Sequence, residues 1–152
     1  MSGTGENRGT ILIVDDDPAV LVLIQSILTA ADYRVLLAAE RADAVRMAAQ
    51  KHIHIDLVLL DVRIPGVSGT ALADELLTIR PNIPVLWMSG FVDDEFIRVK
   101  LLDGYAGFLS KPLHRDGLMR AVERSIEAAR SNSGTPRHMS EKAFTAGGGA
   151  PC

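Results

Sequence analysis

Short apolar runs rich in β-branched residues alternate with segments of helical spacing along most of this chain, and that alternation narrows the possible folds more than any other feature. The five runs that resemble strands occupy residues 11–14, 34–37, 57–60, 84–88 and 107–109. Most of them lack polar alternation, which is typical of strands buried on both faces of a parallel sheet.

Between these runs, apolar residues recur at the spacing of amphipathic helices. The three clearest stripes are Leu21, Ile24, Leu28 and Ala31; Leu72, Leu76 and Ile79; and Leu118, Val122, Ile126 and Ala129. We also expect helices over residues 40–50 and, more briefly, over 93–101. Asp17 and Pro18 suit the start of the first helix, and Pro81 is expected to end the third. Strand–helix alternation of this kind predicts an α/β fold, a doubly wound parallel sheet with helices on both faces.

Composition excludes several classes of protein. The 152 residues carry a net charge of −3, so no basic field for direct nucleic-acid binding is expected. The single cysteine cannot form a disulfide framework, and no apolar run is long enough to cross a membrane or act as a signal peptide. A cytoplasmic protein is therefore expected. We predict a flexible N-terminus over residues 1–9, one domain over 10–130, and a disordered or weakly structured tail over 131–152.

Polar side chains follow the predicted strands at their carboxyl ends, where open α/β sheets bind ligands. The first strand is followed by Asp15 and Asp16, the third by Asp61, the fourth by Ser89 and the fifth by Lys111. Because the strands are parallel, we expect these side chains to meet at one edge of the sheet.

Carboxylates placed this close must take up protons or share a cation. Oxygen ligands without histidine or cysteine favour Mg²⁺. A magnesium ion beside an aspartate is also suited to phosphoryl transfer, because that reaction depends on neutralising charge on the phosphoryl oxygens. The aspartate itself can be the nucleophile and form an acyl phosphate.

Four stretches give these residues a family context. They are Ile13-Val14-Asp15-Asp16, the run from Leu60 to Gly69, Trp87-Met88-Ser89-Gly90 and Phe108-Leu109-Ser110-Lys111-Pro112. Together, in this order and spacing, they make the sequence similar to the receiver domain of bacterial response regulators over roughly residues 10–129. The resemblance implies a flavodoxin-like (βα)5 fold with strand order 2-1-3-4-5.

The resemblance also implies a role for each site residue. Asp61 would accept the phosphoryl group, with Asp16 and Asp61 binding Mg²⁺ directly and Asp15 acting mainly through water. The backbone carbonyl of Arg63 would complete the protein's share of the metal shell. Lys111 and Ser89 would contact phosphoryl oxygens. Phe108 occupies the position of a switch aromatic, and the Lys111–Pro112 bond is commonly cis in the family.

The expected function follows from these roles. The chain would take a phosphoryl group from a phosphohistidine of a sensor histidine kinase or histidine phosphotransfer protein. It would then signal to an output protein still to be identified, with homodimerisation on phosphorylation left open. It would not be an enzyme beyond catalysing its own phosphorylation and dephosphorylation. Two alternatives are a degenerate receiver that binds partners without phosphorylation, and an aspartate-nucleophile phosphatase. The phosphatase is disfavoured because Arg63 stands where a second acid is expected.

Overall fold

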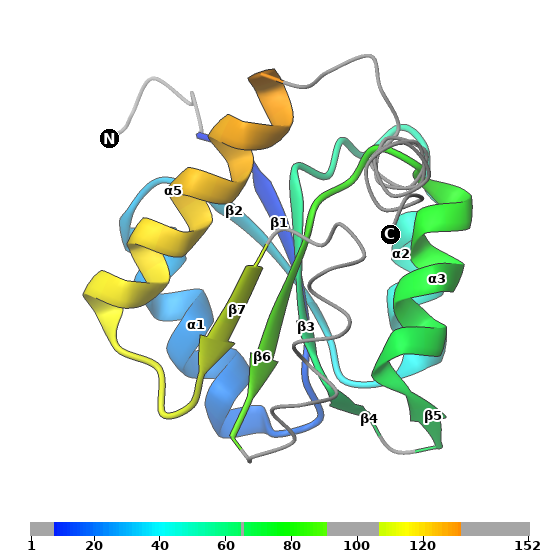
Figure 1. The fold of residues 1–152 in the computed structure, drawn as a ribbon, viewed down its shortest axis with the longest axis horizontal. Helices are drawn as coiled ribbons and strands as arrows, with labels where there is room; N and C mark the ends of the chain where they lie inside the picture. Colours follow the sequence, from blue (N-terminus) through cyan, green and yellow to red (C-terminus); the bar gives the residue numbers. More distant parts are fainter. Residues whose placement is uncertain (1–7, 65, 91–106, 132–152) are drawn as a thin grey trace, which may run out of the picture.

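The five predicted strands form one parallel sheet in the computed structural model, which describes residues 8–64, 66–90 and 107–131. In sheet order they are β2 (Arg34–Ala38), β1 (Thr10–Val14), β3 (Leu57–Asp61), β6 (Val85–Ser89) and β7 (Gly107–Ser110) (Figure 1). This is the predicted order 2-1-3-4-5, because β6 and β7 are the fourth and fifth strands of the sheet. β2, β3, β6 and β7 each extend one residue beyond the carboxyl end predicted from the apolar runs, whereas β1 ends at Val14 as predicted.

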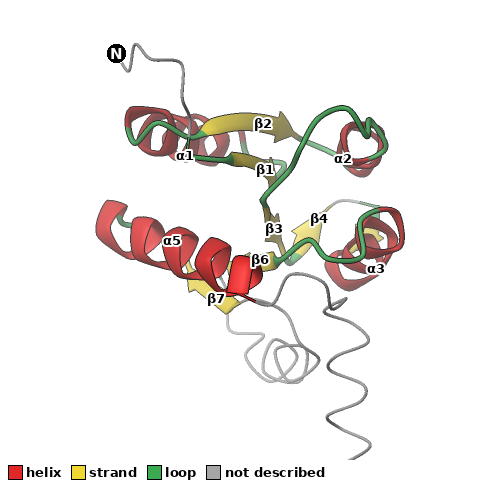
Figure 2. Cartoon of the chain, turned by 90° about the horizontal axis from the view of Figure 1, so that it is seen from above, coloured by secondary structure: helices red, strands yellow, loops and turns green. Residues whose placement is uncertain are grey.

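Helices cover both faces of the sheet, as the alternation predicts. Figure 2 shows α1 (Pro18–Ala30) and α5 (Arg115–Ser131) on one face, with α2 (Arg41–Ala48) and α3 (Gly69–Ile79) on the other. The strand β1 is buried along its whole length, and its alternate residues enter separate cores. Ile11 and Ile13 pack beneath α1 and α5, whereas Leu12 and Val14 pack beneath α2 and α3. A strand that lies between two cores in this way needs apolar residues at successive positions.

The edge strands differ from the central ones. β1, β3 and β6 are buried throughout, whereas β2 and β7 are only partly buried. The helix expected over residues 93–101 lies outside the described residues. No helix among the residues that the structure describes is long and apolar enough to span a membrane.

Local capping agrees with the sequence. The Asp17 carboxylate accepts a hydrogen bond from the backbone N–H of Ala19 at 2.9 Å and so caps α1. The Ser68 hydroxyl accepts one from Ala71 N at 3.1 Å and caps α3, which ends at Ile79, two residues before Pro81. Between β3 and α3 the chain forms a small antiparallel hairpin of β4 (Arg63–Ile64) and β5 (Val67–Ser68) that the sequence did not predict.

Candidate functional site

A cavity of about 690 Å³ opens at the carboxyl ends of the strands, where the sequence predicts a ligand site. Five of its lining residues are candidates from the sequence: Asp15, Asp16, Asp61, Arg63 and Lys111. Arg63 lines it from the start of the small hairpin. The remaining lining residues are Asp17, Val20, Val62, Ile64, Ser68 and Gly90.

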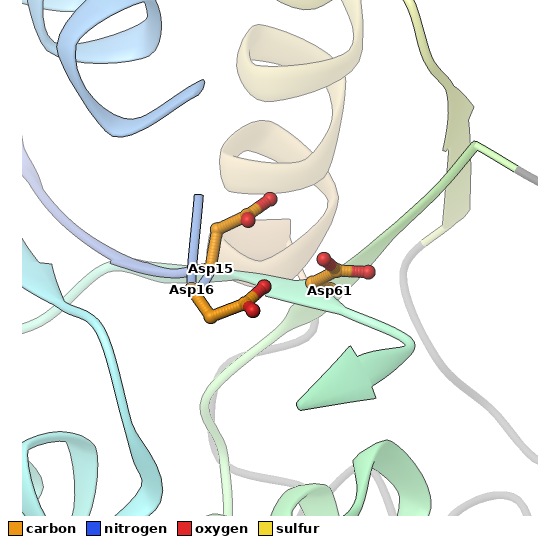
Figure 3. A group of neighbouring side chains, drawn as sticks. All are labelled: Asp15, Asp16 and Asp61. Carbon is orange, nitrogen blue, oxygen red and sulfur yellow. The ribbon is translucent and has the colours of Figure 1, made fainter. Parts of the chain in front are cut away.

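Three carboxylates meet in this cavity. Asp15 and Asp16 directly follow β1 and Asp61 is the last residue of β3, so strand pairing places them side by side (Figure 3). One oxygen from each lies within 4.8 Å of the others. Asp15 is 0% exposed and Asp61 6% exposed, whereas Asp16 faces solvent. The predicted convergence of these side chains is therefore present.

The ammonium group of Lys111 joins two of the carboxylates. Its Nζ lies 3.1 Å from Asp61 Oδ2, to which it donates a hydrogen bond. It also lies 2.7 Å from Asp15 Oδ2, at ion-pair distance but without the alignment of a hydrogen bond. The backbone fixes this position, because Lys111 N donates to Ser89 O at 2.8 Å and so links the ends of β6 and β7. The following Lys111–Pro112 bond is cis.

Backbone N–H groups orient the two buried carboxylates. Asp17 N donates to Asp15 Oδ1 at 2.9 Å, and Arg63 N donates to Asp61 Oδ1 at 3.1 Å. Asp15 Oδ2 is buried and has no aligned hydrogen-bond donor among the described residues. A buried carboxylate oxygen in that condition is costly unless a cation compensates it, and the cation beside it, Lys111, is shared with Asp61.

The electrostatics of the site reflect this crowding. Burial raises the pKa of Asp15, and the charge of Asp61 adds to the rise, while Lys111 and the Asp17 N–H oppose it. Burial lowers the pKa of Lys111, but its contacts with Asp15 and Asp61 outweigh burial, so the net pKa is raised. The two carboxylates thus stabilise the charged form of Lys111 between them.

This donor set fits a hard divalent cation. Three carboxylate charges against one ammonium leave an excess of two negative charges. The ligands offered are oxygens, and Mg²⁺ commonly uses one or two carboxylates and keeps several waters. The open cavity and the exposed Asp16 leave room for those waters. The residues present therefore fit Mg²⁺, with the backbone of Arg63 next to Asp61.

The remaining two candidates, Ser89 and Phe108, are not among the residues that line the cavity. Ser89 is the last residue of β6 and is 3% exposed, and its neighbour Gly90 lines the cavity. Phe108 lies in β7, partly buried against the core beneath α2 and α3, rather than in the cavity. Asp17, the predicted cap of α1, also lines the cavity.

Comparison with known proteins gives these features a family. A model of the response regulator receiver domain matches residues 11–123. The transcriptional regulatory protein ZraR of Salmonella typhimurium is 33% identical over 93% of this chain, which covers 32% of ZraR. The sensor kinase CckA of Brucella abortus is 31% identical over 78% of this chain, which covers 12% of CckA. The chain thus spans at most about a third of the length of these relatives.

Solved structures agree with the fold. A CheY-like response regulator receiver domain from Methanospirillum hungatei JF-1 superposes with a TM-score of 0.75 and is 25% identical, covering 82% of this chain and 98% of its own. NtrX from Brucella abortus has a TM-score of 0.75 and is 29% identical, covering 82% of this chain and 28% of its own.

Proposed function

This chain belongs to the response regulator receiver domain family, and we propose that it accepts a phosphoryl group on Asp61 in a two-component phosphorelay. The observation that carries the proposal is the convergence of Asp15, Asp16 and Asp61 on one cavity, with Lys111 Nζ 3.1 Å from Asp61 Oδ2. An isolated aspartate at a strand end would have neither the acidic neighbours nor the cation.

The proposed reaction moves a phosphoryl group from a histidine to the Asp61 carboxylate. An Asp61 oxygen forms a bond to phosphorus while the phosphorus–nitrogen bond of the phosphohistidine breaks. The imidazole leaves with the electron pair of that bond and takes up a proton. Asp61 needs no general base, because its carboxylate is already the nucleophile. The Arg63 N–H holds one carboxylate oxygen, which limits rotation of the group.

Two side chains are placed to receive the new negative charge. Lys111 would exchange part of its contact with Asp61 for a phosphoryl oxygen, as a charge-assisted hydrogen bond. The Ser89 hydroxyl, at the end of the adjacent strand, would donate to another oxygen. Asp15, Asp16, Asp61 and the backbone carbonyl of Arg63 would hold Mg²⁺. When bound, that ion supplies the positive charge that stabilises the transferred group.

Phosphorylation would be read out through a change of conformation. We propose that Ser89 moves toward the phosphoryl group and that Phe108, in the neighbouring strand, changes rotamer in response. A shift from 1:99 to 99:1 between two conformations requires about 5.5 kcal/mol of differential stabilisation. The proposed readout face includes β7 and α5, and the output would be a contact with another protein.

The proposed donor is a sensor histidine kinase or a histidine phosphotransfer protein. One relative of this chain is a sensor kinase and another is a transcriptional regulator, so both receiver settings occur among its relatives. The chain covers only part of each relative, so their output partners are not carried over to it.

The direct test of this function is intact-mass analysis after exposure to acetyl phosphate and Mg²⁺. We expect one phosphoryl adduct on the wild type and none on Asp61→Asn. The matched control is Asp116→Asn, which changes an exposed aspartate in the first turn of α5 and should leave the adduct in place. An undiminished adduct on Asp61→Asn, or no adduct on the wild type, would contradict the proposal.

A further inference from the structure

The single tryptophan of the chain, Trp87, lies beneath the site and is only 1% exposed. It precedes Ser89 by two residues on β6, so both side chains point to the same face of the sheet. Strand pairing places Leu60 on one side of Trp87 and Phe108 on the other. Trp87 therefore occupies the middle of a three-strand row that begins next to Asp61 and ends at the proposed switch aromatic.

The indole ring also contacts the turn that follows Asp61. A β-carbon added to Gly69 would lie 3.0 Å from Trp87 Cζ3 and 2.6 Å from the carbonyl oxygen of Val62. Gly69 N already donates to Val62 O at 3.2 Å, which closes the turn from β3 to α3. The ring is therefore in close contact with the first residue of α3, from the side of the core.

That turn is the element that orients the phosphoacceptor. Val62 follows Asp61 directly, its N–H donates to Met88 O at 3.0 Å, and the next N–H, of Arg63, donates to Asp61 Oδ1 at 3.1 Å. Loss of the indole ring would leave a void beneath Gly69. The backbone of Val62 and Arg63, which donates these hydrogen bonds, could then move. Displacement of a reacting group by about 1 Å can slow a reaction on the order of 100-fold.

We propose that Trp87 is a positioning residue for phosphorylation: its ring supports the turn that orients Asp61 and connects this turn to Phe108 on the adjacent strand. This inference rests on the proposed function and adds a residue outside the cavity to it. Because packed cores move between discrete arrangements, a rearrangement at Phe108 would also change the surroundings of the indole.

The test compares two substitutions of Trp87 with a core substitution on the same strand. Trp87→Leu removes the ring, and Trp87→Phe keeps a flat aromatic group. Leu86→Ala is the matched control, because Leu86 is 1% exposed but packs into the opposite core, beneath α1 and α5. Each variant is phosphorylated by acetyl phosphate at saturating Mg²⁺ and followed by intact mass, with folding checked by circular dichroism and urea unfolding.

We expect Trp87→Leu to be phosphorylated at least about tenfold more slowly than the wild type, with most of the rate restored in Trp87→Phe. Leu86→Ala should lose stability but keep the rate, because it leaves the turn supported. A wild-type rate in folded Trp87→Leu, or an equal loss in Leu86→Ala, would overturn the inference. Failure of the wild type itself to become phosphorylated would instead overturn the proposed function.

A second readout does not depend on any variant of Trp87 folding. The tryptophan emission of the wild type should change when Asp61 is fully phosphorylated, and the emission of Asp61→Asn should not change under the same treatment. An unchanged emission spectrum in fully phosphorylated wild type would overturn the proposed connection between the turn and Phe108.

Discussion

Among individual residues, Asp15 carries the clearest electrostatic cost. Its side chain is fully buried, and Lys111, with which it forms an ion pair, is shared with Asp61. Burial is the main reason that its pKa is raised, and the charge of Asp61 adds to it. The raised pKa means that the folded protein holds a proton on Asp15 at pH values where the unfolded chain has released it.

The direction of this pKa shift predicts how the stability of the protein changes with pH. Below about 3.9, the ordinary pKa of aspartate, Asp15 is protonated in both states and its charge costs nothing. As pH rises through the folded pKa, the charge must form inside the protein. Without divalent cations, the wild type should therefore lose stability relative to Asp15→Asn as pH rises above about 4, until Asp15 is ionised in the folded state as well. Urea unfolding in EDTA measures the difference, and a pH-independent difference would contradict this explanation.

Gly69 gives a second prediction at this scale. Glycine is required at this position by lack of space and not by its φ angle. A β-carbon there would lie 2.6 Å from the backbone oxygen of Val62, which cannot move aside like the end of a flexible side chain. We expect Gly69→Ala to destabilise the protein by about 1–3 kcal/mol. At Gly117 in α5 a β-carbon meets nothing within 4 Å, so Gly117→Ala should stabilise by roughly 0.5–1 kcal/mol. Equal changes in the free energy of unfolding for Gly69→Ala and Gly117→Ala, measured in urea, would refute the steric argument.

At the scale of elements, the side chains of Arg80 and Lys51 link the carboxyl end of α3 to the end of α2 and the loop that follows it. Arg80, at the C-cap of α3, donates to the carbonyl oxygens of Ala48, Gln50 and Ile53 at 2.7–2.8 Å. Lys51 in turn donates to Ile79 O, the last residue of α3, at 3.1 Å. Two helix C-termini, whose carbonyls lack partners within their own helices, are thereby stabilised.

Removing the Arg80 guanidinium should leave several of these carbonyls without a protein donor. We expect Arg80→Ala to cost about 2 kcal/mol, the scale of hydrogen bonds from a charged donor. The matched control is Arg41→Ala, because Arg41 forms a two-point pair with Glu75 between α2 and α3 at the surface, and such exposed pairs contribute about 1 kcal/mol or less. Urea unfolding of both variants ranks the two effects, and a larger loss in Arg41→Ala would contradict the ranking.

The elements also show what the sequence could predict. The three central strands, β1, β3 and β6, were predictable because full burial leaves unbroken apolar runs. The edge strands β2 and β7 are only partly buried, but they still contain short apolar runs. The hairpin of β4 and β5 was not, because two-residue strands have no periodicity and depend on a turn in which Gly66 has φ of 84°. The contacts of Arg80 were missed because a long side chain that bonds distant carbonyls leaves no pattern in the sequence.

For the whole molecule, parallel topology explains why the site was predictable. Asp61 is 45 residues or more from Asp15 and Asp16 in sequence, yet pairing of β1 with β3 leaves their carboxylate oxygens within 4.8 Å. Residue types at strand ends were enough to predict this convergence. The support of the turn by Trp87 and Gly69 required the structure, because it depends on side-chain packing beneath the sheet. The fold thus brings together mutually repelling charges that a bound cation would stabilise.

The central claim, that these carboxylates form one cation site, is tested most directly by thermal unfolding at increasing Mg²⁺ concentration. At ten times its dissociation constant, a ligand that binds only the folded state stabilises it by about 1.4 kcal/mol, or roughly 3–6 °C for a domain of this size. We predict a rise of this order for the wild type and a much smaller one for Asp61→Asn. An equal rise in both proteins, or none in the wild type, would contradict the claim.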